Sequence, residues 1–345
     1  MTAQQAEQIL ARVAGKRILV IGDLMVDEYI WGHVSRVSPE APVMVVEAES
    51  HTFVPGGAAN VVHNLRVLGA EVVVAGVVGR DVVGERLLDE MRSLGADTSG
   101  VVVAEDRPTT QKTRVIAHSQ SGSQQVVRVD REKRAPLPDP AAVKLIGVSR
   151  DLMTVSDALL FSDYDKGVLA EPTVQTLTEV ARHRGVVVTA NPKPSSAAFY
   201  RGASVIQLKK MEAEHASGVH LVRVPEDTFH EVGMRLRQRL GVDNLLITRS
   251  AQGLTVFTED GGFTDIAPHL VEVFDGTGAG DSTISALTLA LAAGTGVVDA
   301  AAIGNAAGGA VVRKIGVATA RADEIAAMFA TPPAAASGNQ KGSAS

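Results

Sequence analysis

The chain has 345 residues, a formal net charge of −6 and 45% hydrophobic residues, and this is enough apolar material for a substantial core. Its acidic balance, scattered basic residues and 3% aromatic content argue against nucleic acid as a partner. The absence of cysteine excludes disulfides, thiolate metal sites and a cysteine nucleophile. The N-terminus lacks a signal-peptide pattern, and the longest apolar run, 284–293, is too short to span a bilayer. We therefore expect a cytoplasmic protein without a membrane partner.

Short β-branched or apolar runs alternate with longer amphipathic stretches along most of the chain. An amphipathic helix is expected within 1–16. Strands are expected at 17–22, 71–78, 101–104, 158–162, 186–190, 204–207, 245–248 and 254–257. Helices are expected at 56–68, 84–94, 141–153, 171–184 and 225–240, with three more that start near residues 278, 297 and 321. This alternation predicts an α/β fold with a mostly parallel sheet covered on both faces.

Two segments depart from this alternation. Residues 43–54 and 109–130 switch between polar and apolar positions with no helix between their strands. Such ribbons are typical of antiparallel sheets, so we expect a small β-sheet lid formed by about 30–55 and 107–131. A lid of this kind can exclude water from a transfer site, and its exposed edge suggests a homodimer. We expect one domain over 1–330, followed by a disordered Ala/Ser/Gly/Pro-rich tail at 331–345.

The segment 275–281 reads Asp-Gly-Thr-Gly-Ala-Gly-Asp and precedes a small, apolar helical run. A glycine-rich turn that opens a helix directs backbone N–H groups, and the positive end of the helix dipole, toward an anion. Asp281 would repel a phosphate, but it can act as a general base that deprotonates an attacking hydroxyl. This indicates phosphoryl transfer to an alcohol. The alternative is an ordinary strand-to-helix turn in which Asp281 only complements the helix dipole.

Two N-terminal motifs fit a sugar site. Asp23 and Asp27 follow the first strand, where carboxylates can accept hydrogen bonds from sugar hydroxyls. The run 55–60 places a glycine pair and Asn60 at a helix start, and glycines allow a ligand to approach the backbone. A solvated turn aspartate and a plain helix cap are the alternatives.

These motifs, in this order, resemble the ribokinase-like (PfkB) sugar kinase family over nearly the whole chain, from about Arg17 to Phe329. Within that family the resemblance is greatest to kinases of D-glycero-β-D-manno-heptose 7-phosphate. The run 35–43 (Ser-Arg-Val-Ser-Pro-Glu-Ala-Pro-Val) is the most diagnostic segment, and the segments 22–27, 55–61, 162–167 and 248–250 agree with it. The resemblance implies a three-layer α/β/α sandwich, ATP and Mg²⁺ as cofactors, and phosphorylation of the anomeric hydroxyl. In bifunctional heptose enzymes a nucleotidyltransferase domain follows the kinase.

The resemblance also implies a role for each matching position. Asp281 would be the base, and Gly278, Ala279 and Gly280 the anion hole. The sugar would be held by Asp27, Gly56, Gly57, Asn60 and Lys166, and its phosphate by the lid cations Lys112, Arg114 and Arg128, for which solvated surface charges are an equal alternative. The nucleotide would contact Lys209, Glu212, Thr248, Arg249, Gly253, Thr277 and Asn305.

Two positions depart from the family pattern. The family carries an Asn-x-x-Glu motif that organises Mg²⁺, and here Glu212 is present but Lys209 replaces the Asn. Asn191 replaces the Asp of an Asp-Pro-Lys motif. Each change makes the metal side more positive. Lys209 could contact phosphate oxygens directly, or the loss of the metal organiser could leave a sugar-phosphate or nucleotide binder with little turnover. A different acceptor, another sugar or a nucleoside, is the second alternative.

Overall fold

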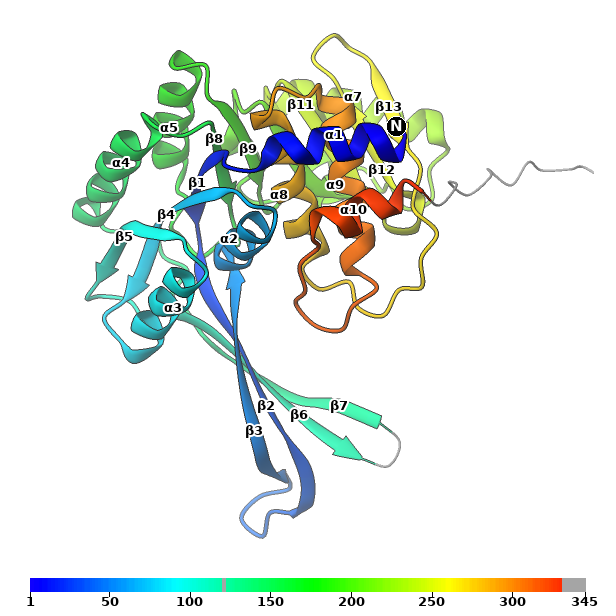
Figure 1. Cartoon of the computed structure of the whole chain (residues 1–345). Helices are drawn as coiled ribbons and strands as arrows, with labels where there is room; N and C mark the ends of the chain where they lie inside the picture. The colour runs from blue at the N-terminus through cyan, green and yellow to red at the C-terminus, as the bar shows by residue number, and fades with distance from the viewer. Residues whose placement is uncertain (120–121, 331–345) are drawn as a thin grey trace, which may run out of the picture.

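The computed structural model describes residues 1–119 and 122–330, so the expected tail at 331–345 lies outside the described residues. The main body is a three-layer α/β/α sandwich, and a long β-sheet lid projects from it (Figure 1). Within the described ranges no helix is both long and apolar enough to cross a membrane.

The central sheet has nine strands in the order β13-β12-β11-β10-β9-β8-β1-β4-β5. Their bounds are β1 Arg17–Gly22, β4 Glu71–Gly79, β5 Asp97–Ala104, β8 Ala158–Ser162, β9 Val187–Asn191, β10 Val205–Lys209, β11 Asn244–Thr248, β12 Leu254–Phe257 and β13 Phe263–Ile266. Only β12 and β13 run antiparallel to their neighbours. The predicted mostly parallel sheet is thus confirmed. The short edge strand β13 was not predicted.

Helices cover both faces of this sheet, because successive strand residues point to opposite sides. One apolar core packs α1 Ala3–Val13, α2 Ala58–Val67, α3 Val82–Ser93, α8 Ala279–Ala292, α9 Val297–Val311 and α10 Ala322–Met328 against the strands. The other packs α4 Asp139–Met153, α5 Glu171–His183, α6 Lys210–Ser217 and α7 Glu226–Leu240. Alternation within a strand is visible in β1, where Val20 belongs to the first core and Ile21 to the second. The predicted helices are all present, and α6 is additional.

The lid is a separate four-stranded sheet in the order β3-β2-β6-β7. Its strands are β2 Leu24–Val37, β3 Met44–Gly57, β6 Thr110–Ser119 and β7 Gly122–Arg131. The hairpins β2–β3 and β6–β7 are antiparallel, and β2 pairs with β6 in parallel. The first ribbon is longer than the predicted 30–55, because β2 starts almost directly after β1 and β3 continues through the glycine pair to Gly57. As a result α2 begins at Ala58 and Asp27 lies on a lid strand.

Candidate active site

The candidate site lies where the carboxyl ends of neighbouring parallel strands meet α8 and the base of the lid. Strands β8, β9, β10 and β11 are adjacent in the sheet, and their last residues are Ser162, Asn191, Lys209 and Thr248. Segments that follow these strand ends therefore lie side by side although they are far apart in the sequence. Ligands of open α/β sheets bind at this edge.

Asp281 lies in the first turn of α8 with 5% of its surface exposed. Gly278 forms the N-cap with a φ of 80° and places no side chain on the helix end. The first backbone N–H groups of α8 have no acceptor within the helix, so they and the helix dipole face the approach to Asp281. The structure thus places the predicted glycine turn at the N-terminus of α8, beside the buried Asp281 carboxylate.

Both oxygens of the Asp281 carboxylate are held by donors from distant segments. Asn60 Nδ2 donates to Oδ2 at 2.7 Å, and the Tyr164 hydroxyl donates to Oδ1 at 2.7 Å. Asn191 Nδ2 approaches Oδ1 at 3.5 Å. Burial raises the pKa of Asp281, while these two strong hydrogen bonds and the charges of Lys193 and Lys209 lower it. A carboxylate whose pKa is raised by burial is a stronger base than an exposed one, so Asp281 can accept a proton from a hydroxyl.

The loop after β8 supplies Tyr164, and a buried carboxylate fixes its course. Asp23 Oδ2 accepts the backbone N–H groups of Tyr164 at 2.8 Å and Lys166 at 3.1 Å. Asp163 accepts hydroxyl hydrogen bonds from Ser196 and Tyr200. Burial, together with the charge of Asp163, raises the pKa of Asp23 to about 6. Asp23 is therefore a positioning residue for the loop and is not exposed to a ligand.

The predicted sugar-binding residues gather at the base of the lid. Asp27 forms an ion pair with Arg114 of the neighbouring strand β6. A side chain on Gly56 would meet Asp27 Oδ2 at 2.3 Å, so only glycine leaves this carboxylate its place. Gly57 adopts a φ of 56° at the N-cap of α2, the helix that carries Asn60. The glycine pair therefore lies between Asp27 on the lid and helix α2, whose Asn60 donates to Asp281.

The basic residues predicted to bind the sugar phosphate, Lys166 after β8 and the cations of the lid, differ in whether an acidic partner already binds them. Lys166 is buried and forms an ion pair with Glu132 at 2.8 Å. The Lys112 ammonium has no hydrogen bond or ion pair to any residue in the described ranges, and burial followed by the Lys166 charge lowers its pKa. Arg128 is paired with Asp130 at 2.8 Å and is half exposed. Among these basic side chains, Lys112 would therefore be stabilised most by a bound anion.

Several of the residues predicted to contact the nucleotide form hydrogen bonds to other groups of the protein. Thr277 donates to Asp275 from its backbone and its hydroxyl, which fixes the anion-binding turn. The buried Arg249 guanidinium donates to both oxygens of Glu226 at 2.6 Å. This side chain is therefore committed within the protein. Gly253 is buried, and its carbonyl accepts from the Arg249 N–H while its own N–H donates to Ser250; Thr248, at the end of β11, is partly exposed. Asn305, a partly exposed residue of the largely buried helix α9, donates to the carbonyl of Ala267 at 2.9 Å.

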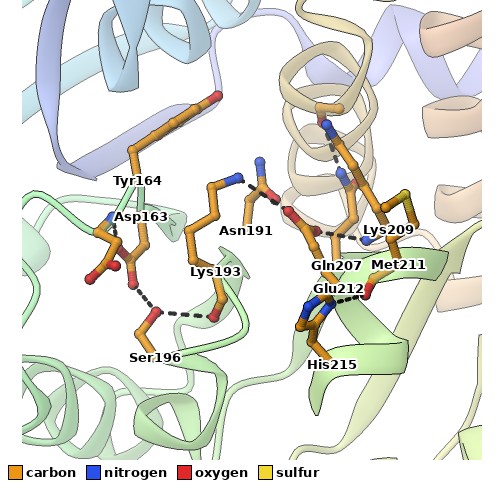
Figure 2. Close-up of polar contacts among 12 residues, drawn as sticks. Asp163, Tyr164, Asn191, Lys193, Ser196, Gln207, Lys209, Met211, Glu212 and His215 are labelled. Atoms are coloured by element: carbon orange, nitrogen blue, oxygen red, sulfur yellow. Dashed lines mark hydrogen bonds and ion pairs between the residues drawn. The ribbon is translucent and has the colours of Figure 1, made fainter. Parts of the chain in front are cut away.

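Glu212, at the start of α6, has both carboxylate oxygens engaged (Figure 2). Lys193 Nζ lies 3.2 Å from Oε1, and the backbone N–H of Lys209 donates to Oε2 at 2.8 Å. In the described part of the chain no cluster of three or more acidic or histidine side chains could hold a metal ion. Lys193 pairs with the Glu212 carboxylate, so part of its negative charge is compensated within the protein.

Sequence reasoning missed three residues of this arrangement. It gave no role to Tyr164 although it noted the segment around it, it left open whether Asp23 is solvated, and it named Lys193 only within a motif. A tyrosine directly after a strand end that carries acidic residues was the available signal for Tyr164. Its partner lies 117 residues away, so the contact itself could not be read from spacing.

Residues 16–324 match the family described as pfkB family carbohydrate kinase. Proteins named "Bifunctional protein HldE" from Geobacter metallireducens and Trichlorobacter lovleyi are 41% and 40% identical over 94% and 95% of this chain. The chain spans 65% of the length of these relatives.

Solved structures with the same fold include Escherichia coli phosphofructokinase-2 in complex with potassium (TM-score 0.74, 16% identity), covering 92% of this chain and 98% of that one. Arabidopsis thaliana ribokinase complexed with ribose and ATP has a TM-score of 0.72 and 13% identity, and covers 92% of this chain and 100% of that one. The ribokinase-like fold, the buried carboxylate beside a glycine turn and the family match agree. The chain belongs to the pfkB family of carbohydrate kinases and is a phosphotransferase that acts on an alcohol group.

Proposed function

We propose that this kinase uses ATP to phosphorylate the anomeric hydroxyl of a sugar phosphate, with D-glycero-β-D-manno-heptose 7-phosphate as the acceptor and the 1,7-bisphosphate as the product. The observation that carries the proposal is the buried Asp281 carboxylate beside the uncapped first turn of α8, with Asn60 and Tyr164 on its two oxygens. The heptose assignment is supported by the run 35–43, which resembles heptose 7-phosphate kinases, and by the match to the HldE proteins.

In the proposed reaction Asp281 accepts the proton of the anomeric hydroxyl as its oxygen attacks the γ-phosphorus of ATP. The bond from that phosphorus to the bridging oxygen breaks, and ADP leaves with the electron pair. The oxygen that Asn60 contacts retains a lone pair for the sugar hydroxyl, because each carboxylate oxygen can accept two hydrogen bonds and Asn60 is its one donor within the described residues. The N–H groups at Gly278, Ala279 and Gly280 stabilise the charge on the transferred phosphoryl group.

The acceptor's own phosphate would bind Lys112, with Arg114 beside it. Lys112 is half-buried, has no partner in the described ranges and is repelled by Lys166. A bound anion would offset both the cost of burying its charge and this repulsion. Arg114 reaches the same face of the lid and is tied to Asp27. A sugar held by Asp27, Gly56 and Asn60 would therefore place its phosphate toward β6, with Arg128 at the outer margin.

Mg²⁺, as proposed, enters with the nucleotide and is held by the nucleotide's phosphates and by water. Glu212 acts only indirectly in this scheme, since Lys193 and the Lys209 backbone occupy its oxygens. When bound, the ion supplies charge neutralisation on the transferring phosphate.

The first test is ADP release with the heptose phosphate as acceptor, compared between the unaltered protein and Asp281→Asn. Loss of the base should lower kcat by at least about a hundredfold while sugar and nucleotide binding, measured by calorimetry, persist. A near-unchanged kcat would refute the role of Asp281. Binding of ATP or sugar without turnover for any acceptor in a panel would instead favour a non-catalytic binding protein.

The second test identifies the class of acceptor. Lys112→Ala should raise KM for a phosphorylated sugar by roughly tenfold or more and leave an unphosphorylated one unaffected. Lys144→Ala, which removes an exposed lysine on α4, is the charge-matched control. Equal effects on both kinds of acceptor would point to another sugar or a nucleoside as substrate.

We also propose that two copies pair through their lids. The lid exposes the large apolar side chains Val37, Val43, Met44 and Val129, each more than half exposed, and it ends in the unpaired edge strands β3 and β7. Sedimentation of the protein and of a Val37→Glu, Val129→Glu variant tests this proposal. A protein that sediments as a monomer would contradict it.

A further inference from the structure

Two lysine side chains flank the first turn of α8 next to the catalytic carboxylate. The Lys209 side chain lies against Gly280, with its Cε 4.0 Å from the point that a Cβ on Gly280 would occupy. The charges of Lys193 and Lys209 both act on Asp281. Both ammonium groups are therefore close to the place where the transferred phosphoryl group must lie between Asp281 and the turn.

The two lysines differ in what already binds them (Figure 2). Lys193 Nζ is 3.2 Å from Glu212 and 4.9 Å from the centre of the Tyr164 ring, so its charge is partly compensated. Lys209 is fixed by its backbone N–H, which donates to Glu212, whereas its Nζ has no hydrogen bond or ion pair to the residues that the structure describes. The chain thus holds the base of this side chain in place and leaves its charged end open.

The surroundings of Lys209 suit an anion better than a metal ion. Each Glu212 oxygen already accepts one donor, and the Lys193 ammonium compensates part of the carboxylate charge, so Glu212 attracts a cation less strongly than a free carboxylate would. Asn191, at the end of β9, is neutral and approaches Asp281 as a donor. The uncapped N-terminus of α8 adds partial positive charge at the same place. The arrangement offers cations and N–H donors to a highly charged ligand, and few open carboxylates to a divalent ion.

We propose that the Lys209 ammonium binds the terminal phosphate of the nucleoside triphosphate and carries part of the charge neutralisation that would otherwise fall to Mg²⁺. This inference rests on the proposed use of ATP and goes beyond it by assigning a residue that distinguishes tri- from diphosphate. A lysine contact of this kind is a point charge with freely placed donors, so it tolerates movement of the phosphate between ATP and product. It makes nucleotide binding less dependent on the metal.

Calorimetric titration with ATP and with ADP tests the proposal, first in excess EDTA and then in saturating MgCl₂. The unaltered protein should bind ATP in EDTA. Lys209→Asn should weaken that binding by roughly tenfold or more, affect ADP much less, and recover most of its ATP affinity in MgCl₂. Asn is a favoured N-cap, so the variant should keep the start of α6 folded. Lys209→Arg should retain metal-free binding, and Lys144→Asn should match the unaltered protein.

The outcomes separate this inference from the proposed function. An unchanged ATP affinity in Lys209→Asn, or equal losses for ATP and ADP, would overturn the inference and leave the kinase assignment intact. Loss of all ATP binding by the unaltered protein in EDTA, with normal binding in MgCl₂, would also overturn it. If the unaltered protein bound no ATP under either condition, the proposed use of ATP and the inference would fall together.

Discussion

The buried Asp23 carboxylate gives the protein a pH-dependent stability that one substitution should remove. Asp23 lies between β1 and β2 with 1% of its surface exposed, and it anchors the loop that carries Tyr164 and Lys166. Burial, reinforced by the nearby Asp163, raises its pKa from 3.8 to about 6. We predict that Asp23→Asn abolishes the part of the pH dependence that this shift causes.

The direction and the size of this change in the free energy of unfolding follow from proton linkage. The folded protein holds the Asp23 proton more tightly than the unfolded chain does, so the stabilisation is fully present below pH 3.8 and is lost as the pH rises through about 6. A shift from 3.8 to about 6 corresponds to a loss of about 3 kcal/mol at higher pH. Between about pH 4.5 and about pH 7.5 the change is about 2 kcal/mol, because part of the loss has already occurred at the lower value.

The measurement is the free energy of unfolding in urea, followed by circular dichroism across this pH range for both proteins. The quantity of interest is the difference between them at each pH. Asn accepts hydrogen bonds from the loop N–H groups less strongly than a carboxylate does. This lowers the free energy of unfolding of the variant by the same amount at every pH. The difference should move by about 2 kcal/mol in favour of Asp23→Asn as the pH rises. A difference that stays constant with pH would show that Asp23 does not titrate as described.

Two further predictions concern the base and the glycine pair. Tyr164→Phe removes a donor that lowers the pKa of Asp281, so the acidic limb of the kcat/KM profile should move to higher pH, and an unmoved limb would refute the contact. Gly57→Ala places a Cβ 2.6 Å from the Asp23 carbonyl at a φ of 56°, and should cost at least about 2 kcal/mol of unfolding free energy in urea. Gly185→Ala has a similar φ of 69° but open space around it, so the prediction fails if both substitutions cost the same.

Most of the fold could be predicted because the signals for it are local. The buried strand 17–22 was evident from its run of apolar residues, and the helix 225–240 from Pro225 at its start. The strand β2 was only partly predicted, because its first residues continue directly from β1 and its outer half is polar. Helix α6 escaped notice since it is short and exposed, with Ala213 its one buried residue.

The site was predicted in outline, because the glycine turn at 278–280 and the following Asp281 are contiguous in the sequence. Their chemistry depends on neighbours that are not. The segment around Arg249 illustrates the difference: as a motif it fits a nucleotide contact, yet in the folded chain the guanidinium is buried against Glu226 and Asp265. A charged side chain can contact a ligand or form an ion pair within the protein, and only its partners in the folded chain distinguish the two.

The sequence by itself determined the alternation of strands and helices, and it predicted the glycine turn as an anion site and Asp281 as the base. These depend on backbone propensities and on residues within a few positions of one another. The tertiary structure alone decided that Asn60 and Tyr164 hold the two oxygens of Asp281, that Lys193 pairs with Glu212, and that the Lys209 ammonium has no partner among the residues described. Parallel strand ends from distant segments meet at one edge of the sheet, and the charge and burial created there set the reactivity of groups that look ordinary in the linear chain.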